Sequence, residues 1–304
     1  MTDSSRAIGV DLGGSGIKAA LVDTERGQLL TERVRVKTPR PAEPAAVIAE
    51  MQALVSQSAV AGGVSTDPDV PVGVGIPSVV IDGVTATAAN IDRGWIGFPA
   101  SRTLSEAFDR RTLVLNDADA AGLAEIRFGA GAGRLGTVLV LTLGTGIGSA
   151  LFLDGRLVPN LELGHIEIRG RIGEARASAT ARIRRNLSWE RWADDLDEYL
   201  HRVDALIWPD LIILGGGISK QAERFIGRLT VRPPVVPAQL QNNAGIVGAA
   251  MHAAEWATTQ RATTEPSKVE RATAARAPEG APGEPTESQG RDEPRAPITT
   301  LVSS

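Results

Sequence analysis

Two glycine-rich segments, one in each half of the chain, have the residue types and spacing of a phosphate-binding site. "GSGIKAAL" begins at Gly14 and "GTGIGSAL" begins at Gly144, and the two segments are identical at five positions. In each, a run of apolar residues leads into the glycine turn and a second run leads out, which predicts two matching β-hairpins. Backbone N–H groups with no side chain in front of them form concave anion sites, and Ser15, Thr145 and Lys18 add hydroxyls and a cation. For either hairpin alone, an ordinary structural turn remains the alternative.

The glycines of both hairpins are expected to adopt positive φ, because glycine does so without a steric penalty. Neither segment opens a helix in the G-x-G-x-x-G manner and no G-x-x-x-x-G-K-[ST] motif occurs, so dinucleotide and P-loop sites are not indicated. A third cluster, Gly215, Gly216 and Gly217, follows the apolar run "LIIL". This cluster would suit a nucleotide lying against a helix start, and a simple strand-to-helix turn explains it equally well.

An acidic residue at a strand end supplies a candidate base. The segment "TLVLNDADAAGLAEI" predicts a strand that ends at Asn116 and a helix that starts next to it. Asp117 then lies where ligands bind in open α/β sheets. The helix dipole is expected to keep Asp117 ionised, so that it accepts a proton from a hydroxyl as that oxygen attacks phosphorus. The alternative is that Asn116 or Asp117 only caps the helix.

Further acids surround one of the three histidines of the chain. In "NLELGHIEI", Glu162, His165 and Glu167 lie close together, and Glu174 follows them. Isolated acids are ordinarily solvated surface residues, but the position of these beside a glycine and a histidine favours a cluster that binds hydroxyl groups. Because the chain has no cysteine, a thiol nucleophile and a thiolate zinc site are excluded.

The residues around these motifs alternate between strand and helix patterns. Short apolar runs at 70–77, 111–116, 137–144 and 210–217 end in turn residues, as is typical of strands. Apolar residues three or four positions apart predict a helix face between the last two runs, formed by Trp189, Trp192, Leu196, Leu200, Val203 and Ile207. The pattern indicates an α/β protein with two domains.

Composition limits the classes of protein and partner. The 304 residues are 42% hydrophobic, which is enough for two cores, and the formal net charge of −4 argues against nucleic acid as a partner. We find no apolar run long enough to span a bilayer and no signal-peptide pattern, so we expect a cytoplasmic protein with no membrane contact. Residues 257–304 have no aromatic side chain and are rich in Pro, Glu, Arg, Ala, Thr and Ser, which predicts a disordered tail.

The motifs "DLGGSGIK", "TLGTGIG", "NDADAA", "ELGH" and "GGGIS" together resemble those of the ROK family of sugar kinases, over residues 7–254. The segments "TAANIDRGWIG" and "PNLELGHIEI" are most similar to the actinobacterial polyphosphate glucokinases within that family. The resemblance implies a duplicated actin-like ATPase (ribonuclease H-like) fold with two domains around a cleft. Residues 1–117, joined by a C-terminal helix at 243–256, would form the small domain, and residues 118–242 the large one. A homodimer is also implied.

By the same resemblance, the chain is expected to transfer a phosphoryl group from polyphosphate or ATP to the 6-hydroxyl of glucose, with Mg²⁺. Asp117 would be the general base, and Asp11 would act on the magnesium ion through water. The donor phosphates would lie against Gly13, Gly14, Ser15, Gly16, Lys18, Gly144, Thr145, Gly146, Gly215, Gly216 and Gly217. The other sugar hydroxyls would be bound by Asn90, Asn116, Glu162, His165 and Glu174, with Glu167 as a secondary candidate.

Two features depart from the pattern of the family. Most members carry a Cys-rich zinc motif after "GH", which this chain and the polyphosphate glucokinases lack, so His165 is expected to bind sugar without zinc. Ser78 stands where a glycine is usual, near the sugar-binding loop, and leaves the sugar preference open. An ATP-only hexokinase for glucose, mannose or an N-acetyl sugar and a non-catalytic sugar sensor remain alternatives.

An arginine-rich segment follows the acidic cluster. It is either a track for a long phosphate chain or a solvated helix face, and its members are Arg169, Arg171, Arg176, Arg182, Arg184 and Arg185.

Overall fold

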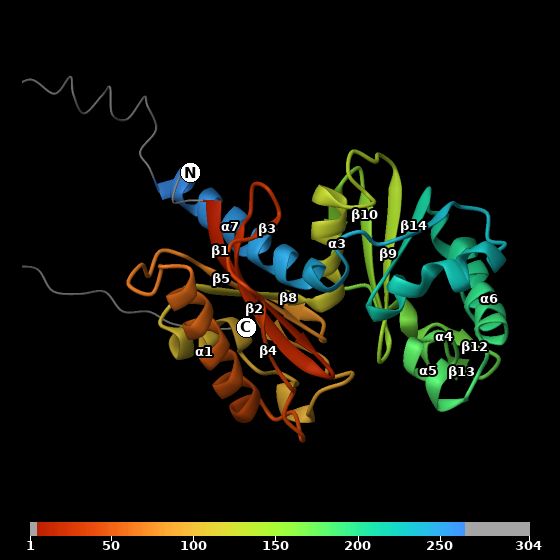
Figure 1. Cartoon of the computed structure of the whole chain (residues 1–304), viewed down its shortest axis with the longest axis horizontal. Coiled ribbons are helices and arrows are strands. Elements are labelled where there is room, and N and C mark those ends of the chain that lie inside the picture. The colour runs from red at the N-terminus through yellow and green to blue at the C-terminus, as the bar shows by residue number, and fades with distance from the viewer. Residues whose placement is uncertain (1–4, 265–304) are drawn as a thin grey trace, which may run out of the picture. The chain divides into compact units, whose positions relative to one another are not determined.

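The computed structural model describes residues 5–264, in which two mixed β-sheets carry the fold (Figure 1). The first sheet has the order β3-β2-β1-β5-β8, with β4 also paired to β2, and consists of β1 (Arg6–Gly13), β2 (Gly16–Asp23), β3 (Gln28–Leu29), β4 (Val34–Val36), β5 (Val72–Ile76) and β8 (Thr112–Asn116). The second has the order β11-β10-β9-β14-β15 and consists of β9 (Thr137–Leu143), β10 (Ile147–Leu153), β11 (Arg156–Val158), β14 (Leu211–Gly215) and β15 (Val235–Pro237). Two short hairpins pair β6 (Val80–Ile81) with β7 (Val84–Thr85), and β12 (Glu167–Ile168) with β13 (Arg171–Ile172).

The two sheets repeat one arrangement of strands. In the first, β1 and β2 form an antiparallel hairpin in which Gly13 lies opposite Gly16, and β5 runs parallel beside β1. In the second, β9 and β10 form the equivalent hairpin, with Leu143 opposite Ile147, and β14 runs parallel beside β9. The predicted pair of matching hairpins and the predicted α/β class are confirmed.

Helices cover both faces of the first sheet because successive side chains of a strand point to opposite faces. Ile8, Val10 and Leu12 of β1 pack in the same core as α1 (Pro44–Ala61) and α2 (Ala100–Phe108). Ala7 of β1 and Ala20 of β2 pack instead with apolar residues of α7 (Ala244–Thr264). In Figure 1, α7 and α1 accordingly lie on different sides of the first sheet.

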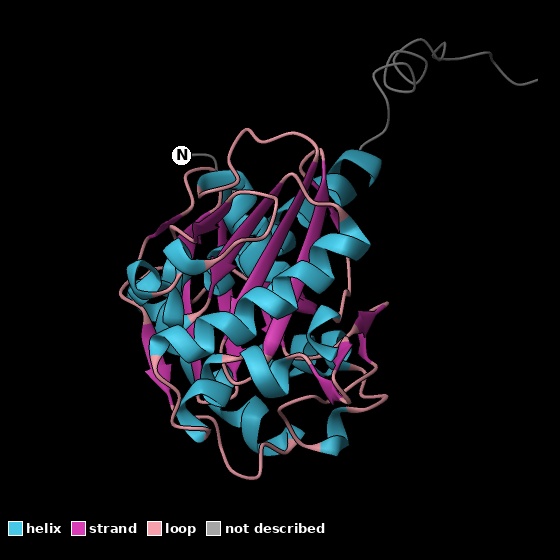
Figure 2. Ribbon diagram, turned by 90° about the vertical axis from the view of Figure 1, so that its right-hand side faces the viewer, coloured by secondary structure: helices cyan, strands magenta, loops and turns pink. Residues whose placement is uncertain are grey.

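The second sheet is also covered on two faces. On one, Leu139 and Leu141 pack with Trp192 and Leu196 of α6 (Trp189–Ile207), as the spacing of apolar residues predicts. On the other, Val138 and Val140 pack with apolar residues of α3 (Asp117–Phe128). Figure 2 looks onto the α6 side and shows helices lying across the strands. The remaining helices are short: α4 (Glu174–Ala177), α5 (Ala179–Arg184), η2 (Arg93–Trp95), η3 (Leu163–His165), η4 (Gly217–Arg224), η5 (Ile226–Arg228) and η6 (Gln241–Asn243).

The helix α3 contacts the elements of both sheets. Its Leu123 and Ile126 pack against the second sheet, whereas Ala124 packs with Ala7 and Val22 of the first. Since β8 of the first sheet leads directly into α3, the residues at this junction lie where the two sheets approach each other.

Several strand, helix and domain boundaries predicted from the sequence can be compared with the observed elements. Each of the four predicted strand runs contains a strand, namely β5, β8, β9 and β14. The C-terminal helix continues to Thr264, past its predicted end at 256, and residues 265–304 of the predicted tail lie outside the described residues. Residues up to Ala262 form one compact unit, so the domain division at residue 117 stays a prediction. Within the described residues, none of the helices is both long and apolar enough to cross a membrane.

Candidate functional site

A cavity of about 250 Å³ lies where the turns of both hairpins meet. Most of the predicted site residues line it, namely Asp11, Gly13, Gly14, Ser15, Lys18, Asn90, Asn116, Asp117, Gly144, Thr145, Gly146, Glu162, His165, Glu174, Gly216 and Gly217. Three predicted residues do not: Gly16, Gly215 and Glu167. Residues that are more than two hundred positions apart in the chain, such as Asp11 and Gly217, thus surround one space.

The two hairpin turns lie directly against each other. A Cβ added at Gly14 would lie 3.3 Å from the hydroxyl oxygen of Thr145. Their backbone groups line the cavity with no large side chain between them, which is the form of an anion site made of main-chain amides.

The prediction of positive φ for the hairpin glycines is wrong, because none of the positive-φ glycines in the described residues belongs to either turn. Space limits two of them, Gly16 and Gly146, whereas a Cβ at Gly144 would meet nothing within 4 Å. A Cβ at Gly16 would lie 2.8 Å from the Arg35 Nε, and one at Gly146 would overlap the Glu174 carboxylate. In the third cluster only Gly216 has positive φ, at 82°, and its Cα lies against the backbone of Leu143.

Asn116 and Asp117 divide two roles between them at the start of α3. The Asn116 side chain is the helix cap and accepts from the amides of Ala118, at 2.8 Å, and Asp119, at 3.1 Å. Its amide group donates to the Ser78 carbonyl oxygen, at 3.1 Å. Asp117, the first helical residue, is therefore not needed as a cap, and its carboxylate is left for the cavity.

The pKa of Asp117 is raised to about 7. Burial is the main cause, the negative charge of Asp11 adds to it, and a backbone hydrogen bond from Ala118 acts in the opposite direction. The expectation that the helix start keeps Asp117 fully ionised is wrong, because desolvation outweighs the dipole. A carboxyl group with a pKa near neutrality suits proton transfer in either direction.

Asp11 is held by a lysine and by the start of the last helix. Its Oδ2 accepts from the Nζ of Lys18 at 2.7 Å, across the β1–β2 pair in which these residues are partners. Gly245 of α7 lies so close that a Cβ there would be 2.9 Å from the Asp11 Cγ. One carboxylate and one ammonium thus lie together beside the first hairpin turn.

The acidic cluster lines the opposite part of the cavity. Glu162 precedes η3 and His165 ends it, with 3.9 Å between the Glu162 Oε2 and the His165 Nδ1. Glu174 begins α4, and its Oε2 accepts from the Ile147 amide of the second hairpin at 3.2 Å. Burial raises the pKa of Glu162, opposed by His165 and reinforced by Glu174. These groups present acceptors and an imidazole of the kind that bind hydroxyl groups.

A further group of residues lines the cavity without having been predicted from the sequence. Ser149 accepts from the Leu163 amide at 3.0 Å and donates to the Leu161 carbonyl at 2.6 Å, and so holds the segment that carries Glu162. Its position just after the second glycine turn was the one feature of the sequence that could have marked Ser149 as a site residue. The others had no local signal or only a small side chain: Pro77, Ala89, Ala121, Thr142, Ile147, Gly148, Leu161, Gln241, Asn242 and Gly245.

Ser78 and the arginine-rich segment both lie outside the cavity lining, and their side chains are engaged elsewhere. The Ser78 hydroxyl is buried and donates to the Thr87 carbonyl at 2.7 Å, so it does not line the cavity. In the arginine-rich segment, Arg176 pairs with Asp195 and Glu198, and Arg185 pairs with Asp195, all carboxylates of α6. None of the six arginines lines the cavity, and the pairing favours the alternative of a helix face.

Comparison with known proteins gives consistent similarities. The model of the ROK family matches residues 7–179. The polyphosphate glucokinase of Mycobacterium tuberculosis (strain CDC 1551 / Oshkosh) is 45% identical over 251 residues, which cover 82% of this chain and 92% of that protein. The crystal structure of the inorganic polyphosphate/ATP-glucomannokinase of Arthrobacter sp. strain KM is 48% identical, with a TM-score of 0.80 over 84% of this chain and 99% of that one. The ROK family glucokinase of Streptomyces griseus, in complex with glucose and AMPPNP, is 26% identical, with a TM-score of 0.68 over 82% and 99%.

Proposed function

The chain belongs to the ROK family, and from that premise we propose that it transfers a phosphoryl group from inorganic polyphosphate or ATP to the 6-hydroxyl of glucose. The product is glucose 6-phosphate. Relatives at 45% and 48% identity over most of the chain, named for polyphosphate as donor and glucose or glucose and mannose as acceptors, support this reaction.

The single observation that carries the proposal is the convergence of Asp117 and both hairpin turns on one cavity. Phosphoryl transfer needs the acceptor oxygen aligned with the phosphorus and the charge of the phosphate neutralised. We assign the turn amides, Ser15 and Thr145 to the donor phosphates, with Lys18 supplying positive charge. Asp117 accepts the proton of the attacking hydroxyl, and its pKa of about 7 leaves it a competent base near neutral pH.

The sugar is assigned to the part of the cavity lined by Asn90, Asn116, Glu162, His165 and Glu174. Donors and acceptors matched to hydroxyl groups penalise an analogue that leaves them unpaired. Because the cavity has groups from both sheets on its walls, movement of the two sheets toward each other would exclude water that competes as acceptor.

Magnesium is the metal that this reaction uses, and the residues of the cavity fit it in a limited way. In the described residues there is no group of three or more metal-binding side chains. Mg²⁺ in phosphoryl-transfer sites is held by one or two carboxylates, water and the phosphates themselves, and Asp11 is a carboxylate of that kind beside the first turn. When bound with the donor, the ion would neutralise phosphate charge. Asp11 is assigned to hold it through water, and the homodimer and cytoplasmic location stay predictions.

A panel of donors and acceptors tests the proposal. Purified protein with Mg²⁺ is given long-chain polyphosphate or ATP, each with glucose, mannose or N-acetylglucosamine, and the sugar phosphate is measured by mass spectrometry. We expect glucose 6-phosphate with both donors. Product with ATP alone would leave an ATP-only hexokinase, and no product with any pair would leave a sugar sensor.

A further inference from the structure

Basic side chains line the exposed face of the strand next to the first hairpin. In β4 (Val34–Val36) the two valines pack against the core of the first sheet, whereas Arg33, Arg35 and Lys37 alternate with them and are exposed. Arg40 follows three residues later in an irregular segment and is also exposed. We call Arg33, Arg35, Lys37 and Arg40 the basic strip. Same-face residues of a strand recur about every 7 Å, so the strip offers positive charge at regular intervals.

The strip runs alongside the first hairpin turn. Lys18, which lines the cavity, is the cross-strand partner of Arg35, and the Arg35 guanidinium lies against Gly16. Between Lys37 and Arg40, the Thr38 hydroxyl donates to the Gly13 carbonyl at 2.6 Å. The Arg40 Nη2 lies 3.3 Å from the Gly14 carbonyl oxygen. The strip is therefore fixed to the same turn that we assign to the donor phosphates.

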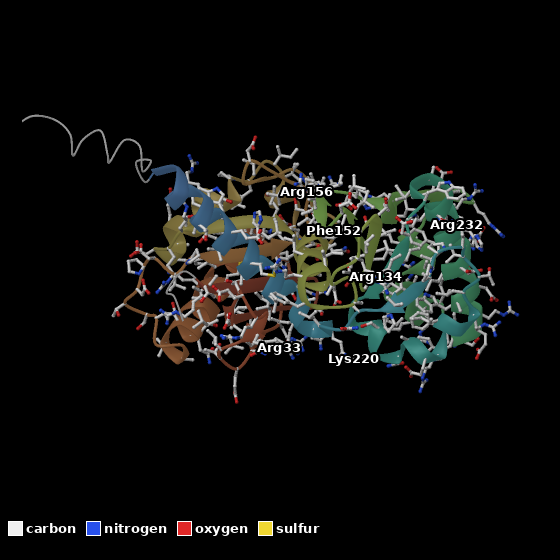
Figure 3. All side chains as sticks on the ribbon, turned by 90° about the horizontal axis from the view of Figure 1, so that it is seen from above. Arg33, Arg134, Phe152, Arg156, Lys220 and Arg232 are labelled. Atoms are coloured by element: carbon white, nitrogen blue, oxygen red, sulfur yellow. The ribbon has the colours of Figure 1, made fainter. Side chains whose placement is uncertain are left out.

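One end of the strip reaches the loop before α7. Arg33 donates to the Asn243 Oδ1 at 2.9 Å, and the neighbouring Asn242 lines the cavity. Figure 3 shows Arg33 and Lys220, both labelled, along one margin of the structure. Lys220 of η4 is exposed as well.

The other end of the strip borders a second cavity. This space, of about 270 Å³, is lined by Arg40 and shares Gly14 and Asn90 with the first cavity. One acid lines it, Asp92, and that carboxylate is engaged by the Gly94 amide at 2.7 Å. An anionic chain that leaves the first cavity past Gly14 thus comes beside Arg40, the one basic residue that lines this space, as well as beside Asp92.

The positive charges of the basic strip are not neutralised by ion pairs. Within the described residues, Arg35, Lys37 and Arg40 have no carboxylate partner within 4 Å, whereas Arg176 and Arg185 of the arginine-rich segment are paired with Asp195. Unpaired exposed cations create the local potential that draws in a polyanion. The strip is therefore better suited to a long phosphate chain than the arginine-rich segment that the sequence singled out.

We propose that the basic strip binds the distal part of an inorganic polyphosphate, the units beyond those held by the two hairpin turns. The inference rests on the proposed function and adds a way in which the protein distinguishes long polyphosphate from ATP. Polyphosphate carries charge along its whole length, whereas ATP ends in an uncharged nucleoside after three phosphates. Contacts on the strip then strengthen binding of long polyphosphate and leave ATP and tripolyphosphate almost unaffected.

The test compares donors in a variant that removes the strip. In the triple variant Arg35→Ala, Lys37→Ala, Arg40→Ala, we expect the KM for long-chain polyphosphate to rise by at least ~10-fold and its dependence on salt to weaken. The KM values for ATP and tripolyphosphate should rise much less, because neither donor extends along the strip and the variant takes from the turn only the Arg40 bond to the Gly14 carbonyl and the Arg35 contact with Gly16. Lys37→Glu alone changes a side chain that makes no hydrogen bond or ion pair in the described structure, and it should raise only the KM for long polyphosphate.

A matched control comes from the arginine-rich segment. Arg171 and Arg184 are exposed arginines of the rejected segment, so the double variant Arg171→Ala, Arg184→Ala removes surface charge elsewhere. Equal KM values for long polyphosphate in wild type, the triple variant and Lys37→Glu would overturn the proposal, as would a larger rise in the control. Wild-type protein that uses ATP but no polyphosphate at all would instead refute the proposed donor.

Discussion

Asp117 stands at a helix start and in a desolvated cavity wall, and these two environments act on its pKa in opposite directions. The helix start favours the carboxylate. Burial and the charge of Asp11 favour the neutral acid, and they dominate, because the pKa rises to about 7. The helix cap is supplied by Asn116, so the Asp117 carboxylate is free to act on a ligand.

Replacement of Asp117 by asparagine tests its assignment as base. The amide keeps the shape of the side chain but does not accept the proton, so we expect kcat to fall by at least ~10²-fold. Glucose binding, measured by calorimetry, should be nearly unchanged. Asp119→Asn is the matched control, because Asp119 lies on the same helix outside the cavity lining and its substitute can still accept from the Asn160 amide. Near-normal turnover in Asp117→Asn would remove the residue from this role.

The raised pKa of Asp117 also predicts a pH profile. Below about pH 7 the carboxyl group is protonated and cannot act as a base, whereas above that pH it is ionised. With donor saturating, we expect kcat/KM for glucose to fall as the pH drops below 7 and to level off above it. Measuring the profile with ATP and with long-chain polyphosphate separates titration of the enzyme from titration of the donor. A rate that stays constant down to about pH 5 with both donors would contradict the assignment.

At the scale of elements, close approach of helices to strands sets the positions of the site residues. The start of α7 lies against Asp11, and its second turn lies so close to β5 that a Cβ at Gly73 would overlap the Ala249 carbonyl. Ala120 of α3 approaches Gly248 of α7 in the same way. Because Gly73 and Gly248 have no side chain, α7 can pack closely against β5 and against α3.

Gly73→Ala should destabilise the protein because the backbone of α7 must move away from β5. Overpacking in a core typically costs 1–3 kcal/mol, and a clash with backbone belongs at the upper end, so we expect a loss of about 3 kcal/mol in urea unfolding. Gly227→Ala is the control, since a Cβ there meets nothing within 4 Å and its φ is not positive. Equal unfolding midpoints for the two variants would show that the contact has no such effect.

For the whole molecule, much of the fold and of the site could be predicted from short motifs. The repeated hairpin sequence indicated two related halves, and strand ends marked Asn116 and Asp117. Gln241 and Asn242 were missed because the loop before α7 returns to the cavity from a distant part of the chain. The hairpin glycines were misread for a similar reason, since Arg35 and Glu174, which limit their space, come from other elements. The sequence alone did not show that the arginine-rich segment forms ion pairs with Asp195 and Glu198, because these carboxylates lie on a different element, α6.

The link between the two halves of the chain can be tested at Asn160, which follows β11 of the second sheet. Its side chain donates to the Val80 carbonyl at 2.9 Å and accepts from the Val80 amide at 3.0 Å, and Val80 belongs to the β6–β7 hairpin in the first half of the chain. Its own amide donates to Asp119 at 2.9 Å. These bonds hold elements from the two halves together two residues before Glu162.

Asn160→Ala removes both side-chain bonds to Val80. Since each such bond contributes about 0.5–1.5 kcal/mol and 1.4 kcal/mol is a factor of ten, we expect the KM for glucose to rise about tenfold while kcat changes little. The gain in melting temperature on adding glucose should shrink in parallel. Asn186→Ala is a matched control, because Asn186 has a φ of 48° and Asn160 a φ of 64°, so both substitutions carry the backbone strain of a left-handed residue. If the two variants bind glucose equally well, the strain and not the link accounts for any change, and the halves are held together by other contacts.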